Sequence, residues 1–282
     1  MTDKMKNLAV RTLSGIVLAA VVLGAVAWSP WSFGALLLLL LVGGMHEFYA
    51  LAEARGDRPQ RLIGMVTGAV LFAVNFAFLS GSAGAAGGLR PLLAAGMAFL
   101  LLLLPLMLVC ELYRRGENPA ANVGVTLLGV CYVALPLTLM AYIPFVGRYA
   151  WNPWTMLFFV FIIWANDVFA YLVGMAFGRH RLFERLSPKK SWEGFFGGVA
   201  GALVMGYVAS RCMGEAWWVW IGLALVAAVT GVLGDLVESM FKRAAGVKDS
   251  GTIIPGHGGI LDRFDAMLLA APFVVVYLWF VL

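Results

Sequence analysis

Acidic, basic and hydroxyl side chains gather between residues 235 and 265 in a pattern that suits chemistry on phosphates. Four of them are spaced at i, i+3, i+4 and i+7, which would place them on one face of a helix: Asp235, Glu238, Ser239 and Lys242. A glycine-rich stretch and two further acids, Asp262 and Asp265, follow. Carboxylates are ligands that Mg²⁺ prefers, usually together with substrate phosphates, and the N–H groups of a glycine-rich loop can cradle phosphate oxygens. The pattern therefore predicts metal-dependent phosphoryl or nucleotidyl transfer.

A cationic segment precedes this region. Residues 178–194 carry five positive charges: Arg179, Arg181, Arg185, Lys189 and Lys190. Within the segment, the block Ser-Pro-Lys-Lys-Ser at 187–191 places hydroxyls and ammonium groups beside a turn, which favours contacts with phosphate oxygens. The alternative is that these charges reflect only a cytoplasmic loop and its attraction to acidic lipid headgroups.

Asp167 lies well inside the sixth apolar run of the chain. A charge at the centre of a bilayer costs at least ~2.5–3.5 kcal/mol on insertion scales, so such a residue usually faces a cavity or a partner. Tyr171 follows one helical turn later and would share the same face. We therefore expect a functional role for Asp167, with a structural ion pair to an arginine such as Arg263 as the alternative.

The composition defines the surroundings in which these residues must be held. Of the 282 residues, 62% are hydrophobic and 12% are charged, whereas soluble domains have about 45–50% and about 25%. The mean hydropathy of +0.90 agrees with this comparison. These values exclude a soluble enzyme, a disordered tail and a disulfide-stapled secreted domain. The three cysteines are scattered and show neither metal-ligand spacing nor a disulfide framework.

Nine apolar runs are long enough to cross a membrane as helices. They lie near residues 10–28, 32–52, 62–80, 91–110, 123–145, 154–174, 195–212, 216–236 and 264–282. With the N-terminus in the cytoplasm, 17 of the 20 lysines and arginines fall inside, and Arg90, Arg148 and Arg211 remain outside. The sequence therefore predicts an all-α polytopic membrane protein with a cytoplasmic N-terminus and an outside C-terminus. The first run could also be a signal peptide, but its length predicts a retained span.

Several residues within or beside these runs are expected to serve packing or anchoring. Pro105 and Pro136 predict helix kinks that neighbouring helices can accommodate. Close helix packing is predicted for four glycines that open the seventh run: Gly194, Gly197, Gly198 and Gly201. The pair His46-Glu47 lacks the second histidine of a metalloprotease helix, so we expect it to anchor the helix at the membrane interface.

The run from Ser239 to Asp265 resembles the signature of the phosphatidate cytidylyltransferases, also called CDP-diacylglycerol synthases. It reads Ser-x-Phe-Lys-Arg-x4-Lys-Asp-x-Gly-x2-Ile-Pro-x-His-Gly-Gly-Ile-x-Asp-Arg-Phe-Asp, and every fixed position of that signature is filled. The blocks Asp167-x-x-Ala170-Tyr171 and 187–194 are also similar to that family. The resemblance rests on motifs over residues 164–282 and on topology alone before them. One departure is Val168-Phe169, where the family has small or hydroxyl residues.

This resemblance implies a multi-pass fold, a homodimer, and a reaction in which CTP and phosphatidate give CDP-diacylglycerol and diphosphate. It implies Mg²⁺ as cofactor, with a monovalent cation such as K⁺ beside it, and no nucleic acid among the partners. The expected location is the bacterial plasma (inner) membrane, with the active site facing the cytoplasm. Residues 1–150 would then supply scaffold, dimer contacts and lipid access, and residues 151–282 would be catalytic.

The resemblance also suggests residue roles. Asp235 and Asp262 are the first-choice metal ligands, followed by Asp167 and Asp265. The phosphates of CTP and phosphatidate would be neutralised by Lys242, Arg243, Lys248 and Arg263. Second-line phosphate contacts would come from Lys189, Lys190, Ser187 and Ser191.

The remaining site residues would shape the loop or orient the cations. His257 would shape the loop together with Gly258 and Gly259, and a proton-transfer role for His257 stays open. Ser239 and Asp249 complete the substrate-binding set. Glu238 and Asp249 are expected to orient the cations rather than to bind metal.

Two other functions are compatible with these residues. A lipid-linked phosphotransferase or a lipid kinase would share acids and cations at a cytoplasmic face. An ion-coupled transporter would use Asp167 and Asp235 as coupling-ion sites. The transporter reading predicts charged groups near the bilayer midplane in both halves, whereas here they cluster at one face of the second half.

Overall fold

The computed structural model describes residues 3–81, 90–146 and 150–282. Within these ranges nine helices are long and apolar enough to cross a membrane, which confirms the all-α polytopic prediction. The predicted outside residue Arg148 lies beyond the described ranges. Contacts within the chain define two units: unit 1 comprises Met1–Tyr142 and Ala244–Asp262, and unit 2 comprises Ile143–Arg243 and Arg263–Leu282. The glycine-rich segment 244–262 therefore folds with the N-terminal helices.

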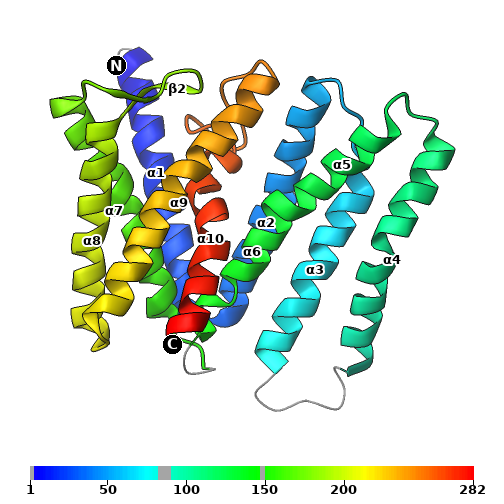
Figure 1. The fold of residues 1–282 in the computed structure, drawn as a ribbon, viewed down its shortest axis with the longest axis horizontal. Helices are drawn as coiled ribbons and strands as arrows, with labels where there is room; N and C mark the ends of the chain where they lie inside the picture. The colour runs from blue at the N-terminus through cyan, green and yellow to red at the C-terminus, as the bar shows by residue number, and fades with distance from the viewer. Residues whose placement is uncertain (1–2, 82–89, 147–149) are drawn as a thin grey trace. The chain divides into compact units, whose positions relative to one another are not determined.

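Unit 1 is built from the first helices of the chain (Figure 1). Its helices are α1 (Asp3–Trp28), α2 (Pro30–Ala54), α3 (Arg61–Gly81), α4 (Arg90–Arg114), α5 (Pro119–Gly129), the π-helical turn η1 (Val130–Ala134) and α6 (Leu135–Met140). Helix α2 begins at a reciprocal cap: the hydroxyl of Ser29 accepts the N–H of Ser32, and the hydroxyl of Ser32 accepts the N–H of Ser29. Pro30 occupies the first helical position, where its missing N–H is no loss.

The two prolines inside the apolar runs of unit 1 have different settings. Pro136 follows the π-helical turn η1, so α5, η1 and α6 form one span with a local change of helix type. Proline lacks the N–H that an α-helix needs and its ring crowds the preceding turn, and a π-helical turn is a usual way to accommodate both. Pro105 lies within the uninterrupted helix α4.

The core of unit 1 surrounds α2. Its largest fully buried side chains on this helix are Phe33, Leu37, Leu41, Met45 and Tyr49. The hydroxyl of Tyr49 donates to the carbonyl oxygen of Thr126 at 2.9 Å. A Cβ built on either Gly64 or Gly129 would overlap the ring of Tyr49, so both glycines are needed to admit it. The hydrogen bond and the two small residues fix α3 and α5 against α2.

Unit 2 contains a helical bundle (Figure 1). Its elements are the 3₁₀ turn η2 (Ile143–Phe145), α7 (Pro153–Phe177), strands β1 (Arg181–Phe183) and β2 (Ser187–Ser191), α8 (Trp192–Met213), α9 (Trp217–Ala244) and α10 (Leu261–Val281). The last helix starts in unit 1, because Leu261 and Asp262 belong to that unit. The cationic segment is a two-stranded antiparallel hairpin in which Arg181 pairs with Ser191.

Helices α7 and α8 pack against each other through glycine, as the sequence predicted. A Cβ built on Gly198 would lie 2.7 Å from the carbonyl oxygen of Asn166, and one on Gly194 would lie 2.8 Å from that of Ala170. These neighbours are backbone atoms and cannot move aside as a side chain can. The small residues therefore set the distance between the two helices.

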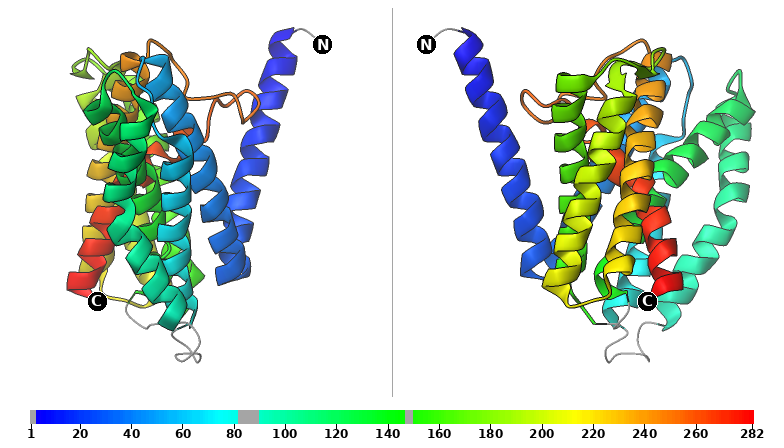
Figure 2. Two further views of the ribbon diagram at one scale, coloured as in Figure 1. Left: turned by 90° about the vertical axis from the view of Figure 1, so that its right-hand side faces the viewer. Right: turned by 60° about the vertical axis from the view of Figure 1, so that its left-hand side comes forward.

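The outer helices of unit 1 have apolar faces that the unit itself does not cover. Only 11% of the apolar window of α1 and 22% of that of α4 are buried. Figure 2 shows that α1 and α2 diverge with distance from the turn that joins them. Leu101 and Leu112 of α4 are 77% and 73% exposed. Such surfaces suit contact with lipid acyl chains.

Replacing Gly198 with alanine should destabilise the protein, because the new methyl group would force α7 and α8 apart. Overpacking of this kind costs about 1–3 kcal/mol. Gly24→Ala is the matched control: nothing lies within 4 Å of a Cβ at Gly24, and alanine favours a helix over glycine. Thermal unfolding in detergent should show a lower midpoint for the first variant and an unchanged or higher one for the second. Equal midpoints would contradict the packing role.

Candidate functional site

Three carboxylates of unit 2 form a cluster that could hold a metal ion. Asp235 and Glu238 lie one turn apart on α9, and Asp265 lies on α10. One oxygen from each can be chosen so that all three lie within 4.8 Å of one another. A Cβ built on Gly234 would lie 2.5 Å from the carbonyl oxygen of Asp265, so the backbones of α9 and α10 nearly touch here. This close approach brings the acids of two helices together.

Two of the three acids in this cluster are each paired with a lysine. The Nζ of Lys190, from strand β2, lies 2.5 Å from Oδ2 of Asp235, and the Nζ of Lys242 lies 2.5 Å from Oε2 of Glu238. The hydroxyl of Ser239 is 3.3 Å from Oδ1 of Asp235. The predicted polar stripe on α9 is thus present, and its members contact one another. Glu238 thus contacts a cation, as expected, and it also belongs to the carboxylate cluster.

A cavity of about 420 Å³ opens beside Asp235 in unit 2. Its volume falls in the range of small-molecule sites. The charged and hydroxyl residues that line it are Asp167, Lys189, Lys190, Ser191 and Asp235. Its apolar lining comes from Ala170, Tyr171, Met175, Leu182, Phe195 and Val232. The cavity therefore combines charged groups of both signs with an apolar wall.

The hairpin that carries the lysines is tied to the start of α8 by Glu193. This carboxylate accepts the N–H groups of Arg179 and His180, at 3.1–3.3 Å, and contacts Nδ1 of His180 at 2.6 Å. Ser191 is buried and its hydroxyl accepts the N–H of Gly194 at 3.1 Å, which makes it the N-cap of α8. Glu193 was not among the site residues predicted from the sequence, although an acid in the first turn of a helix is a recognisable signal.

The glycine-rich loop in unit 1 is organised by two carboxylates. Oδ2 of Asp262 accepts the N–H of Gly259 at 2.8 Å and the N–H of Ser250 at 2.9 Å. Glu47 of α2 accepts the N–H groups of Ile260 and Leu261, both at 2.9 Å. Glu47 is 2% exposed, so the expected role as an interface anchor was wrong: the side chain points into the protein rather than to the lipid headgroups.

The tip of the same loop meets helix α1. Arg11 donates to the carbonyl oxygen of Gly256 at 2.9 Å, and the hydroxyl of Ser14 donates to the carbonyl oxygen of Pro255 at 2.9 Å. The hydroxyl of Ser14 is also 2.7 Å from Nδ1 of His257. Figure 2 shows the loop reaching across to α1. His257 therefore has a structural partner, and no sequence signal had linked α1 to this loop.

The site residues named from the sequence fall into two groups, one in each unit. Unit 2 holds Asp167, Ser187, Lys189, Lys190, Ser191, Asp235, Ser239, Lys242, Arg243, Arg263 and Asp265. Unit 1 holds Lys248, Asp249, His257, Gly258, Gly259 and Asp262. The carboxylate cluster within unit 2 contains two of the four predicted ligands, Asp235 and Asp265, and adds Glu238. Arg243 and Arg263 are exposed.

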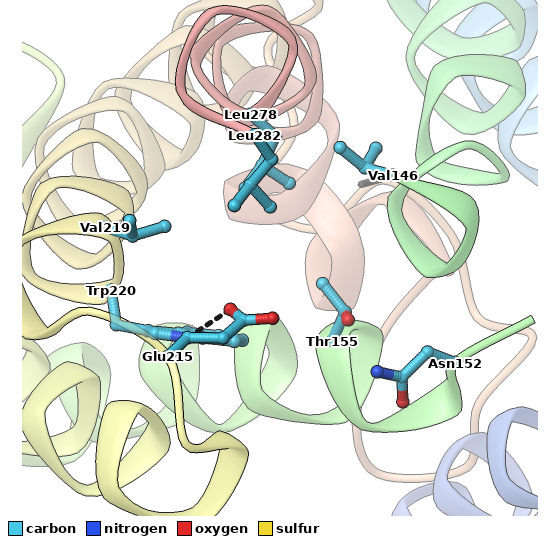
Figure 3. A pocket seen from close by; sticks show the side chains of 8 residues that line it. All are labelled: Val146, Asn152, Thr155, Glu215, Val219, Trp220, Leu278 and Leu282. Carbon is cyan, nitrogen blue, oxygen red and sulfur yellow. Dashed lines mark hydrogen bonds between the residues drawn. The ribbon is translucent and has the colours of Figure 1, made fainter. Parts of the chain in front are cut away.

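A second, smaller cavity of unit 2 lies among the first residues of α7 and α9 and the last residues of α10 (Figure 3). It measures about 120 Å³. Its one carboxylate, that of Glu215, accepts the indole N–H of Trp220 at 2.9 Å. A single acid already engaged with a buried tryptophan makes this cavity a weak candidate for metal or phosphate chemistry.

Comparison with known proteins gives a match along nearly the whole chain. A sequence model of the cytidylyltransferase family matches residues 9–281. The chain is 32% identical to a phosphatidate cytidylyltransferase of Synechocystis, over 95% of both proteins. It is 33% identical to that of Haemophilus influenzae, over 96% of this chain and 99% of the relative. A third relative of that name, from Staphylococcus aureus, is 45% identical over 127 residues, or 44% of this chain and 48% of the relative.

Ser191→Ala should destabilise unit 2 by about 1 kcal/mol, because it removes the cap of α8. Ser191→Asn keeps an oxygen at the cap and should retain most of the stability, whatever it does to ligand binding. Thermal unfolding of the two variants and the wild-type protein in detergent measures the difference. Equal losses in both variants would argue against the capping role.

Proposed function

Because the chain belongs to the cytidylyltransferase family, we propose that it is a membrane-bound phosphatidate cytidylyltransferase. It would convert CTP and phosphatidate to CDP-diacylglycerol and diphosphate. The family and the named relatives identify it as a nucleotidyltransferase, and its apolar helices make it a multi-pass membrane protein. The observation that carries the substrate assignment is the cavity of unit 2, which combines lysines and acids with an apolar wall.

The lipid substrate matches this lining. Lys189 and Lys190 would contact the phosphate of phosphatidate. This phosphate monoester carries a charge of about −1.5 to −2 at neutral pH, because its second pKa is near 6. Tyr171, Met175 and Phe195 would contact the glycerol and the first part of the acyl chains. The contact of Lys190 with Asp235 would hold the lysine at the edge of the cavity until the anionic substrate arrives.

The donor set of unit 2 fits a divalent cation. Asp235, Glu238 and Asp265 offer oxygen ligands, which Mg²⁺ prefers, and a cation would offset the repulsion between three neighbouring acids. When bound, Mg²⁺ would supply charge neutralisation on the phosphates of CTP. Asp167 and Asp262 remain proposed ligands, and K⁺ remains a proposed second ion.

The reaction needs positioning more than acid–base chemistry. An ionised oxygen of the phosphatidate phosphate attacks the α-phosphorus of CTP; a new P–O bond forms and the bond to diphosphate breaks. The nucleophile is already ionised, so no strong general base is required. Lys242, Arg243, Lys248 and Arg263 are the proposed cations that would offset charge on the phosphates during transfer.

The proposed setting follows from the distribution of positive charge. With 17 of the 20 lysines and arginines on one side, the N-terminus and the active site would face the cytoplasm and the C-terminus would lie outside. The plasma membrane of a bacterium is the proposed location, and a homodimer is the proposed assembly. CTP would then reach the site from the cytoplasm and phosphatidate from the bilayer.

Purified protein in mixed micelles should transfer label from base-labelled CTP into the lipid phase when phosphatidate and Mg²⁺ are present. Diphosphate should appear in equal amount, and EDTA should abolish both products. Release of labelled CDP without label in the lipid phase would instead indicate a lipid kinase. Absence of lipid label from folded protein would contradict the proposed function.

Asp235→Asn should lower kcat by at least about 100-fold, which is typical when one preorganised electrostatic group of a transition state is lost. The variant also loses the charge that holds Lys190. Asp57→Asn is the control, since Asp57 pairs with Arg55 in the loop after α2 and lies outside the proposed site. The label-transfer assay at saturating substrates separates the two. Normal turnover by Asp235→Asn would remove this residue from the site.

A further inference from the structure

Glu47 is a buried acid in a part of the chain for which the sequence indicated no chemistry. It lies in α2, is 2% exposed, and belongs to the same unit as the glycine-rich loop. Burying a carboxylate is costly unless hydrogen-bond donors or cations satisfy it. In the part of the chain that the structure describes, no lysine or arginine forms an ion pair with Glu47. Its charge is satisfied by the loop instead.

Three donors from the loop converge on this carboxylate. Oε1 of Glu47 accepts the N–H of Ile260 at 2.9 Å. Oε2 accepts the N–H of Leu261 at 2.9 Å and lies 3.0 Å from the hydroxyl of Ser250. Hydrogen bonds to an ionised acceptor are about twice as strong as neutral ones. These contacts therefore hold the loop at Ser250 on one side and at Ile260 and Leu261 on the other.

The loop backbone is shaped to wrap around this side chain. A Cβ built on Gly251 or on Gly259 would collide with the carboxylate of Glu47. Two of the glycines in the loop are therefore explained by the acid on α2 rather than by a ligand. The absence of side chains at these two positions lets the loop pass close enough for Ser250, Ile260 and Leu261 to donate to the carboxylate.

Ser250 links Glu47 to Asp262. Its hydroxyl is 3.0 Å from Oε2 of Glu47 and 3.0 Å from Oδ2 of Asp262, and its backbone N–H donates to the same oxygen of Asp262. The position of the Asp262 carboxylate is thus coupled to that of Glu47 through one residue. Removal of the charge on α2 would disturb the loop and the acid together.

We propose that Glu47 is a positioning residue for nucleotidyl transfer, which holds the glycine loop and the carboxylate of Asp262 in the conformation that receives CTP and its metal ion. The inference rests on the proposed function, in which Lys248 and Asp262 belong to the nucleotide site. Glu47 itself acts through Ser250 and through the N–H groups of Ile260 and Leu261.

Glu47→Gln is the test variant, because it keeps the shape and removes the charge. The side-chain NH₂ of the new glutamine can only donate, and the loop groups around it are also donors, so at least one hydrogen bond to the loop would be lost. Glu53→Gln is the matched control: it removes a charge from the same helix at an exposed site, where Glu53 pairs with Arg61. The concentrations of CTP and Mg²⁺ that give half-maximal rate should each rise about 10-fold or more in Glu47→Gln. The KM for phosphatidate should stay unchanged, and Glu53→Gln should match the wild-type protein.

Amide hydrogen exchange gives a readout that needs no activity. Peptides covering residues 250–261 should exchange at least about 10-fold faster in Glu47→Gln than in the wild-type protein or Glu53→Gln, while peptides from unit 2 should not change. If Glu47→Gln fails to fold, Ser250→Ala should show the same selective effects, since it removes the link to Asp262.

Two results would overturn the proposal. One is unchanged exchange in residues 250–261. The other is a fall in apparent kcat with unchanged half-maximal concentrations for CTP and Mg²⁺, as expected if the substitution only reduces the folded fraction. A wild-type protein without label transfer would instead refute the proposed function, and the exchange result would still decide whether Glu47 holds the loop.

Discussion

Carboxylates at the ends of apolar helices need partners from the protein itself, and this constraint shapes both units. Asp235 and Glu238 are each paired with a lysine. Glu111 of α4, which is 3% exposed, contacts Gln60, Asn122 and Arg114 at 2.7–3.0 Å. Because an unsatisfied buried charge is so costly, each acid determines the position of the segment that supplies its donors. The acids therefore act as fixed points of the fold as well as candidates for chemistry.

Glycine makes these fixed points possible. Gly234 lets α10 come close to α9 where the carboxylate cluster forms, and Gly251 and Gly259 let a loop close over Glu47. In each case the missing Cβ is what allows a backbone or a carboxylate to reach hydrogen-bonding or metal-binding distance. The same reasoning explains the contact between α7 and α8 at Gly194 and Gly198. Both helices line the cavity of unit 2.

The sequence predicted what depends on local pattern. The apolar runs gave the spans, and the spacing from Asp235 to Lys242 gave the stripe on α9, because both follow from the geometry of a single helix. The contacts of Glu47 could not be predicted, since a single acid within an apolar run has no periodic partner and its donors lie more than 200 residues away. The pairing of Lys190 with Asp235 was hidden for the same reason. Tertiary structure, which no local signal encodes, decides such pairs.

The separation between Glu47 and its donors also has a consequence for biogenesis. Ser250 follows Glu47 by 203 positions, and a ribosome needs roughly 10–40 s to synthesise such a stretch. During that interval α2 has been made, while the groups that donate hydrogen bonds to its carboxylate have not. Until residues 250–261 have been made, the carboxylate of Glu47 can be satisfied only by water or by other parts of the chain. Completion of the loop then brings the three donors that satisfy this carboxylate in the folded protein.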